Sequence, residues 1–199
     1  MSTTFLLIRH AAHDRVGSTL CGRMPGVTLG EEGRRQSAAL AARLEREGIA
    51  ALHTSPMERA RETAAPVAAR LGIEARVNEG VMEIDFGAWT GRSFASLDGD
   101  PDWARWNEER ATARTPGGES MAEAQSRALA ELERLRARHA GETVAVVTHG
   151  DVIKAVLAHH LGLTLNGIHR FEIAPASISA VAAWDGGGKV MGMNETVPA

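Results

Sequence analysis

Two apolar runs, each ending abruptly at charged or imidazole side chains, constrain the fold of this chain most. Residues 5–8 read Phe-Leu-Leu-Ile before Arg9 and His10, and residues 143–148 read Thr-Val-Ala-Val-Val-Thr before His149. Apolar runs of this length without helical spacing predict strands that are buried on both faces. If the two strands are neighbours in a parallel sheet, His10 and His149 face each other at its carboxyl edge, where open α/β sheets bind ligands.

Predicted strands alternate with predicted helices through most of the chain. This alternation indicates an α/β fold with a mostly parallel central sheet covered by helices on both faces. We expect residues 1–199 to form a single domain, with a cover segment around residues 79–119. Further strands are expected at 49–53 and 74–78, short helices at 94–97 and 103–110, a helix at 151–161, and a terminal hairpin at 178–193.

Capping patterns predict where three other helices begin. Residues 28–31 (Thr-x-x-Glu) and 120–123 (Ser-x-x-Glu) read as capping boxes, and residues 55–58 (Ser-Pro-Met-Glu) place a proline at the first helical position. The first of these helices is expected to end at Gly48. Pro66 is expected to kink or break the second helix, because proline lacks the backbone N–H of a helix interior.

Composition excludes several classes of function. A net charge of −3 leaves no basic excess for nucleic acid or an anionic membrane surface, and no run approaches the ~20 apolar residues of a membrane span. The single cysteine, Cys21, cannot form an internal disulfide and is expected to line the core or a pocket wall. The N-terminus lacks the basic and apolar regions of a signal peptide, so we expect a cytoplasmic protein.

Other candidate motifs do not fit their functions. Residues 186–189 read Gly-Gly-Gly-Lys but lack the following Ser or Thr and a helix, so they predict a hairpin turn and not a phosphate loop. His159 and His160 lack metal-ligand spacing and are expected at a helix C-terminus. No metal site and no cofactor are predicted.

Five residues from four segments form the strongest candidate site. Three strand ends bring Arg9 with His10, Arg59, and His149 to one edge of the sheet. Two arginines and two histidines would repel one another unless a multiply charged anion lay between them. Phosphate fits this arrangement, because the planar fork of arginine matches its oxygen atoms. Glu83 lies among apolar residues, where desolvation would raise its pKa.

Five blocks in order along the chain resemble the histidine phosphatase superfamily, which includes cofactor-dependent phosphoglycerate mutases and α-ribazole phosphatases. Together the blocks span nearly the whole chain. Five blocks in the family's order are a specific signal for this superfamily. The blocks are Arg9-His10, residues 55–64 (Ser-Pro-Met-Glu-Arg-Ala-x-x-Thr-Ala), residues 83–91 (Glu-x-x-Phe-Gly-x-Trp-x-Gly), residues 116–120 (Pro-Gly-Gly-Glu-Ser) and residues 147–150 (Val-Thr-His-Gly).

The resemblance implies a role for each site residue. His10 matches the nucleophile that becomes phosphorylated, and Glu83 matches the proton donor. Arg9, Arg59 and His149 match the phosphate pocket, where His149 is expected to be protonated when phosphate is bound. Gly150 belongs to the last of the matching blocks and is placed with the phosphate-binding residues. Asp85 is a rival to Glu83 two residues away; we prefer Glu83, which occupies the family position, and expect a structural role for Asp85.

The chain departs from the family pattern beside the nucleophile. Ala11 stands where the family usually has glycine, and its methyl group is tolerated if φ is negative but could narrow the pocket. Val16 stands where the family often has an asparagine that contacts phosphate; Ser18 or backbone N–H groups around Gly22 would substitute. His13 is either an extra donor in the pocket or a loop residue bonded to the backbone.

The leading hypothesis is a phosphomonoesterase that hydrolyses a small soluble phosphate ester through a phosphohistidine, with inorganic phosphate as product. A mutase-type phosphoryl transfer is the alternative. Mutases of this superfamily tend to carry extra segments that close the site, and this chain has little room for them. A non-catalytic phosphate-binding protein is the third hypothesis, and it gains nothing from a site in which all five positions hold competent residues. The sequence identifies neither the substrate nor the oligomeric state.

Overall fold

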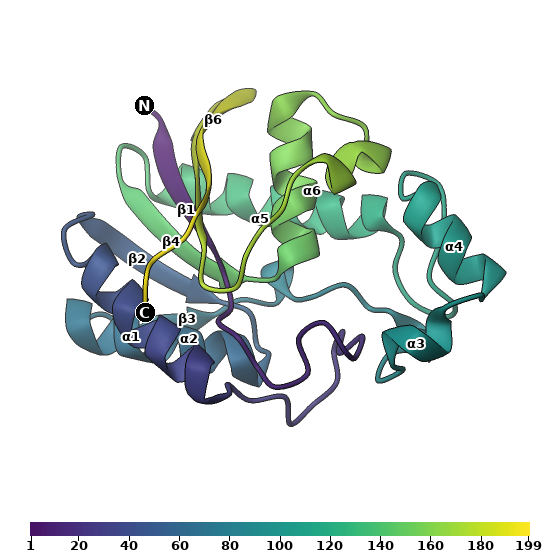
Figure 1. Ribbon diagram of the computed structural model, residues 1–199. Helices are drawn as coiled ribbons and strands as arrows, with labels where there is room; N and C mark the ends of the chain where they lie inside the picture. Colours follow the sequence, from purple (N-terminus) through teal and green to yellow (C-terminus); the bar gives the residue numbers. More distant parts are fainter.

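A computed structural model describes residues 1–199 and contains one six-stranded sheet, in the order β3-β2-β4-β1-β5-β6 (Figure 1). The pairs β1·β4, β2·β4 and β2·β3 are parallel, whereas β1·β5 and β5·β6 are antiparallel. The predicted mostly parallel α/β sheet is therefore confirmed, with the predicted hairpin at one edge. The strands are β1 (Thr3–Arg9), β2 (Ile49–Thr54), β3 (Ala75–Val77), β4 (Thr143–Thr148), β5 (Ile178–Trp184) and β6 (Gly187–Glu195).

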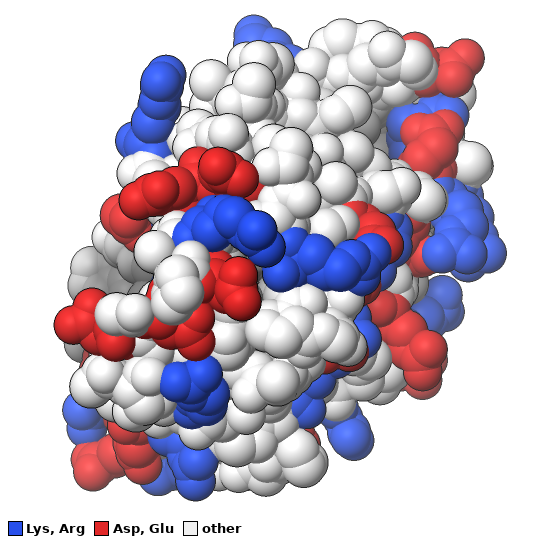
Figure 2. Space-filling model, turned by 90° about the vertical axis from the view of Figure 1, so that its right-hand side faces the viewer, with Lys and Arg blue, Asp and Glu red and all other residues white.

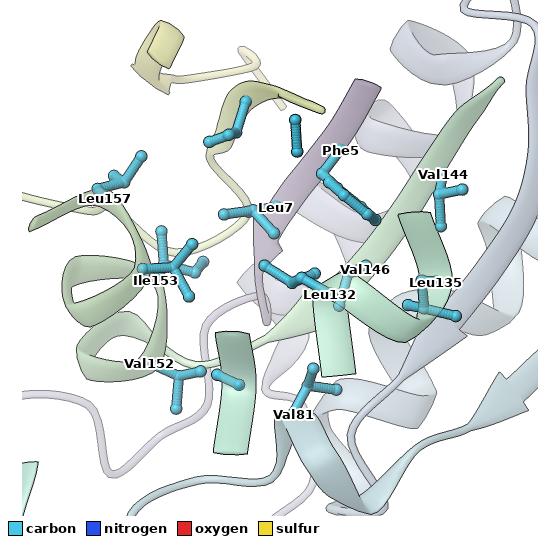
Figure 3. Close-up of a cluster of buried hydrophobic side chains, with 14 of the residues drawn as sticks. Phe5, Leu7, Val81, Leu132, Leu135, Val144, Val146, Val152, Ile153 and Leu157 are labelled. Carbon is cyan, nitrogen blue, oxygen red and sulfur yellow. The ribbon is translucent and has the colours of Figure 1, made fainter. Parts of the chain in front are cut away.

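Helices cover both faces of this sheet. Successive side chains of a strand point to opposite faces, so Phe5 and Leu7 of β1 enter one core cluster and Leu6 and Ile8 enter another. The first cluster lies under α5 and α6 (Figure 3), and the second lies under α1 and α2. These helices are α1 (Glu31–Leu44), α2 (Glu58–Leu71), α5 (Met121–Arg138) and α6 (Gly150–Leu161).

A smaller cover lies beside α5 and α6, within the predicted segment 79–119. It contains α3 (Phe94–Leu97) and α4 (Pro101–Glu108), with short 3₁₀ helices at Glu79–Val81 and Gly87–Trp89, and a third at Leu165–Arg170 beyond the cover. Fully buried Trp106 anchors the cover in its own apolar cluster. On the face that carries α3 and α4, acidic and basic side chains are interspersed, and neither sign dominates (Figure 2).

Two predicted helix starts and one predicted helix end are wrong, and the predicted break at Pro66 does not occur. Helix α1 begins at Glu31 behind Gly30 without a side-chain cap, so the box at residues 28–31 does not form, and the helix ends before Gly48. Helix α2 begins at Glu58 behind Met57, and Ser55 serves the site instead of capping the helix. The helix also runs unbroken through Pro66 to Leu71. Buried Val67 next to Pro66 joins the core cluster under α1 and α2, and this packing holds the helix together.

The capping box at Ser120 is confirmed, because its side chain accepts from the Glu123 N–H while the Glu123 side chain accepts from the Ser120 N–H. No helix combines the length and apolar character that crossing a bilayer requires.

Candidate active site

Three neighbouring strand ends bring the predicted site together. Arg9 is the last residue of β1 and His10 follows it, Arg59 lies in the first turn of α2 after β2, and His149 follows β4 and caps α6. Because β1 and β4 pair in parallel, with Arg9 opposite Thr148, the two histidines meet with ring centroids 5.3 Å apart. The predicted approach of His10 and His149 at the sheet edge is confirmed.

A hollow of about 180 Å³ opens at this edge of the sheet. Seven of the eight predicted site residues line it, and the eighth, His149, lies fully buried directly behind them against Arg59. The lining residues are Arg9, His10, His13, Val16, Gly17, Thr19, Leu20, Cys21, Gly22, Arg59, Glu83, Phe86, Phe94, Gly150, Asp151, Lys154, Glu172 and Ile173.

His10 presents an unprotonated ring nitrogen. Its Nδ1 lies 2.9 Å from the carbonyl oxygen of Ala11, an atom that can only accept, so Nδ1 carries the proton and Nε2 keeps its lone pair. Burial, and after it the Arg59 guanidinium, lower the pKa of His10 well below its ordinary value. The imidazole is therefore neutral near pH 7, which a nucleophile at nitrogen requires.

His149 has the opposite tautomer. Its Nδ1 accepts from Nη2 of Arg59 at 3.2 Å, so its Nε2 carries the proton and donates to Oγ of Ser55 at 2.7 Å. Burial and the nearby Arg59 charge lower the pKa of His149 well below its ordinary value. Although Nδ1 also lies 3.6 Å from a carboxylate oxygen of Glu83, the imidazole is neutral and forms no ion pair there.

The two arginines offer donors that no protein atom accepts. Arg59 is almost fully buried, and Nη2 donates to the carbonyl oxygen of Gly22 at 2.7 Å while Nε and Nη1 have no partner. Arg9 donates from Nη1 to the carbonyl oxygen of Ile173 at 2.6 Å, and its buried Nε is likewise unpartnered. A Cβ on Gly150 would stand only 3.3 Å from that Nε, so glycine leaves room for the guanidinium. Unpaired buried guanidinium donors fit a polyoxyanion.

Glu83 is the buried acid of the site. Burial raises its pKa to about 7, with the Asp151 carboxylate adding to the effect and the Arg59 charge opposing it. The loop of Glu83 is fixed from behind, because Arg23 and Arg127 both donate to its backbone carbonyl oxygen, at 2.8 and 3.1 Å. The predicted rise in the pKa of this carboxyl group by desolvation is confirmed.

The positions of Asp85, Cys21 and Ala11 relative to the hollow test the predictions made for these three residues. Asp85 does not line the hollow, and its carboxylate accepts from the Gly87 N–H at 2.9 Å, as a structural role requires. Cys21 is a buried wall residue, as expected. Ala11 does not line the hollow and its φ is not positive, so its methyl group does not narrow the pocket.

The hydrogen bond of His13 fits the interpretation of a loop residue bonded to the backbone, and its side chain also reaches the hollow. His13 lines the hollow, with its ring stacked on His10 at a centroid distance of 5.3 Å, and its Nδ1 accepts from the Arg15 N–H at 3.3 Å. Burial lowers the pKa of His13 to about 4, so it adds no positive charge near pH 7. Ser18, the suggested substitute for the family asparagine, is not among the lining residues, whereas Gly22 is.

Four residues of the site were not identified from the sequence. Ser55 was interpreted as a helix cap, although its position directly after a strand was a signal for the site edge. Asp151 and Lys154 follow the His149-Gly150 pair at the spacing of one helix face, and this periodicity could have placed them beside Gly150. Glu172 lies in a loop with no pattern, so only the fold brings it to the hollow.

The chain matches the family model of the histidine phosphatase superfamily (branch 1) over residues 5–196, and it belongs to that superfamily. It is 33% identical over 181 residues to phosphoserine phosphatase 1 of Hydrogenobacter thermophilus, covering 88% of this chain and 84% of the relative. The structure of a mycobacterial glucosyl-3-phosphoglycerate phosphatase superposes with a TM-score of 0.88 at 25% identity, covering 98% of this chain and all of the other.

A bifunctional protein of Mycobacterium tuberculosis is 33% identical over 197 residues, which are 98% of this chain and 54% of that protein. This chain therefore spans about half the length of that relative. The family membership and the phosphatase names of the two other relatives agree with the expectation that the chain is a phosphatase.

Proposed function

We propose that this chain hydrolyses small phosphate monoesters through a phosphohistidine at His10. The observation that carries the proposal is the neutral imidazole of His10, whose free Nε2 lies in a hollow with the unpaired donors of Arg9 and Arg59. This combination supplies a nucleophile together with the charge that a transferring phosphoryl group needs.

In the first step, the ester phosphate lies against Arg9 and Arg59, and the Nε2 lone pair of His10 attacks phosphorus. The N–P bond forms as the P–O bond to the alcohol breaks, and the protonated carboxyl group of Glu83 donates its proton to the leaving oxygen. A pKa of about 7 leaves a large fraction of Glu83 protonated at neutral pH, which suits a general acid.

In the second step, the Glu83 carboxylate takes a proton from a water molecule, and that water attacks phosphorus. The N–P bond breaks, its electron pair returns to Nε2 of His10, and phosphate leaves with Glu83 protonated again. His149, buried behind Arg59 and fixed by Ser55, accepts from the guanidinium at Nδ1 and keeps it in place. A proton on Nδ1 would break this hydrogen bond, so His149 acts in its neutral form. Gly22 and His13 form the wall beside the phosphate.

No step uses a metal ion, so we propose that chelators leave the activity unchanged. Phosphoserine, the substrate in the name of one relative, is a reasonable first compound to test. We further propose a cytoplasmic location, where the single free Cys21 stays reduced.

The test of the proposal is trapping of the intermediate. We expect the wild-type protein, quenched during turnover of a ³²P-labelled ester, to carry acid-labile, base-stable label, and we expect His10→Ala to carry none. His53→Ala is a matched control, because His53 is a buried histidine outside the hollow and its replacement should leave the label in place. Equal labelling of the His10 variant would refute His10 as the nucleophile.

A further inference from the structure

Lys154 is a cation of the hollow that the phosphate site does not use. It lies on α6 one turn after Gly150, so both residues face the hollow. It is one of only two lysines in the chain, the other being Lys189 on β6. The Lys154 side chain is only 12% exposed, and its Nζ lies 3.3 Å from a carboxylate oxygen of Glu172.

The ion pair between Lys154 and Glu172 is easily exchanged. The side chain of Glu172 is 81% exposed, so water screens the pair, and pairs of this kind contribute about 0–1 kcal/mol. A ligand carboxylate that entered the hollow could take the place of Glu172 on the ammonium group at little cost. Glu172 would then return to solvent, where its charge is hydrated.

The charges around Lys154 select a singly charged group. Asp151 and Glu172 are carboxylates that line the same end of the hollow, and Arg110 pairs with Asp151 at 3.1 Å. With Asp151 paired to Arg110 and Glu172 returned to solvent, the ammonium group of Lys154 is left as a single unpaired positive charge. A carboxylate matches one ammonium group, since each carries a single charge.

The size of the hollow indicates what part of a ligand it can hold. Its volume of about 180 Å³ lies below the roughly 300–1,000 Å³ of pockets for drug-sized ligands. A phosphate and a leaving group of a few carbon atoms fill a space of this size. Val16, Leu20 and Phe94 line the hollow as well and give the carbon atoms of the leaving group an apolar surface.

We infer that Lys154 binds a carboxylate on the leaving group, so that the preferred substrates are small phosphorylated hydroxy acids or amino acids. This inference rests on the proposed phosphatase function, because it assigns the second half of the substrate whose phosphate lies between Arg9 and Arg59.

Two substrates that differ only in a carboxylate test this inference. O-Phosphoserine and O-phosphoethanolamine share the phosphate and the ammonium group, and only phosphoserine has the carboxylate. We expect the wild-type kcat/KM to be at least tenfold higher for phosphoserine. In Lys154→Met, which keeps most of the aliphatic volume, we expect that preference to vanish through a 10- to 100-fold loss on phosphoserine. Lys154→Arg should keep part of the preference, and Lys189→Met should keep all of it.

A wild-type protein that hydrolyses both esters equally well, or a Lys154→Met variant that loses the same factor on both, would overturn the inference. These results differ from a failure of the phosphatase proposal, in which no phosphohistidine would form from any ester. In Glu172→Gln we expect kcat/KM for phosphoserine to stay equal or to rise by a few-fold. A tenfold fall would show that the Lys154–Glu172 pair does not open for the substrate.

Amine labelling gives a readout that is independent of turnover. With acetic anhydride and the His10→Ala protein, we expect 3-phosphoglycerate to slow acetylation of Lys154, whereas inorganic phosphate should not. Exposed Lys189 is an internal reference whose labelling should not change. Equal protection of Lys154 by both anions would place its ammonium group in the phosphate site and refute the inference.

Discussion

His10 and His149 lie next to each other, yet their hydrogen bonds protonate opposite ring nitrogens. The carbonyl oxygen of Ala11 takes the Nδ1 proton of His10, whereas the guanidinium of Arg59 leaves no proton on Nδ1 of His149. The sequence predicted that the two imidazoles meet, because strand ends can be read from apolar runs. It could not predict their tautomers, which depend on single backbone and side-chain contacts made only in the fold.

The pKa of Glu83 predicts how activity depends on pH. Burial raises this pKa to about 7, so the carboxyl group loses its proton as pH rises through 7. With an alkyl phosphate, whose leaving oxygen needs a proton, we expect kcat/KM to fall about tenfold per pH unit above that value. Glu83→Gln should be slower by roughly 100- to 10,000-fold on alkyl phosphates at pH 6. Its activity should also lack the fall above pH 7, because the amide does not titrate.

p-Nitrophenyl phosphate is the control in these pH profiles, because its leaving group departs without a proton. The loss in Glu83→Gln should be smaller with this substrate. Equal losses on both substrates would contradict the role of Glu83 as a general acid.

The same pKa predicts how stability depends on pH. The folded-state pKa of Glu83 lies above its ordinary value of 4.5, so the group favours the folded state below pH 4.5 and this contribution is lost as pH rises through 7. A rise of this size corresponds to about 3 kcal/mol. We therefore expect Glu83→Gln to gain about 2–3 kcal/mol of unfolding free energy relative to wild type between pH 4.5 and pH 8.5. Urea unfolding at the two pH values measures this change, and a constant difference would contradict it.

At the scale of helices and strands, apolar periodicity predicted the elements better than capping patterns predicted their ends. All six strands were expected, since each is a short apolar or alternating run between turn residues. The patterns at residues 28–31 and 55–58 satisfy the same sequence rule as the box at Ser120. Only the last forms, because the side chain of Ser55 bonds His149 and α1 starts three residues after Thr28.

The capping pattern that forms, at Ser120, and one that does not, at Thr28, give a matched pair of variants for stability measurements. We expect Ser120→Ala to lower the free energy of unfolding by about 1 kcal/mol, because it removes the side-chain acceptor for the Glu123 N–H at the start of α5. Thr28→Ala should change it by less than about 0.5 kcal/mol, since exposed Thr28 caps no helix. Thermal or urea unfolding of both variants checks the contrast, and equal losses would mean that Thr28 has a stabilising contact of its own.

At the scale of the whole molecule, the part of the site at the sheet edge could be predicted from the sequence, whereas the part formed by the cover could not. The convergence of Arg9, Arg59 and His149 at one sheet edge was expected, because strands that alternate with helices form a mostly parallel sheet whose carboxyl ends share an edge. The order of the strands was not predicted. The rest of the wall depends on how the cover packs through Trp106 and on the loop that brings Glu172 to the hollow. Those contacts join segments far apart in the chain without any pattern, so the leaving-group side of the site was not predictable.

The shape of the whole molecule favours hydrolysis over intramolecular exchange of phosphate. The exposed side chains of Val16 and Glu172 line the hollow, so this part of its rim is open to water. A mutase must keep its product bound and water out until the second transfer, whereas an open rim favours hydrolysis. With 3-phosphoglycerate and a trace of 2,3-bisphosphoglycerate, we expect phosphate release to match loss of the ester, with no 2-phosphoglycerate formed. Phosphorus NMR follows all the species at once, and isomer exchange without phosphate release would reverse the assignment in favour of a mutase.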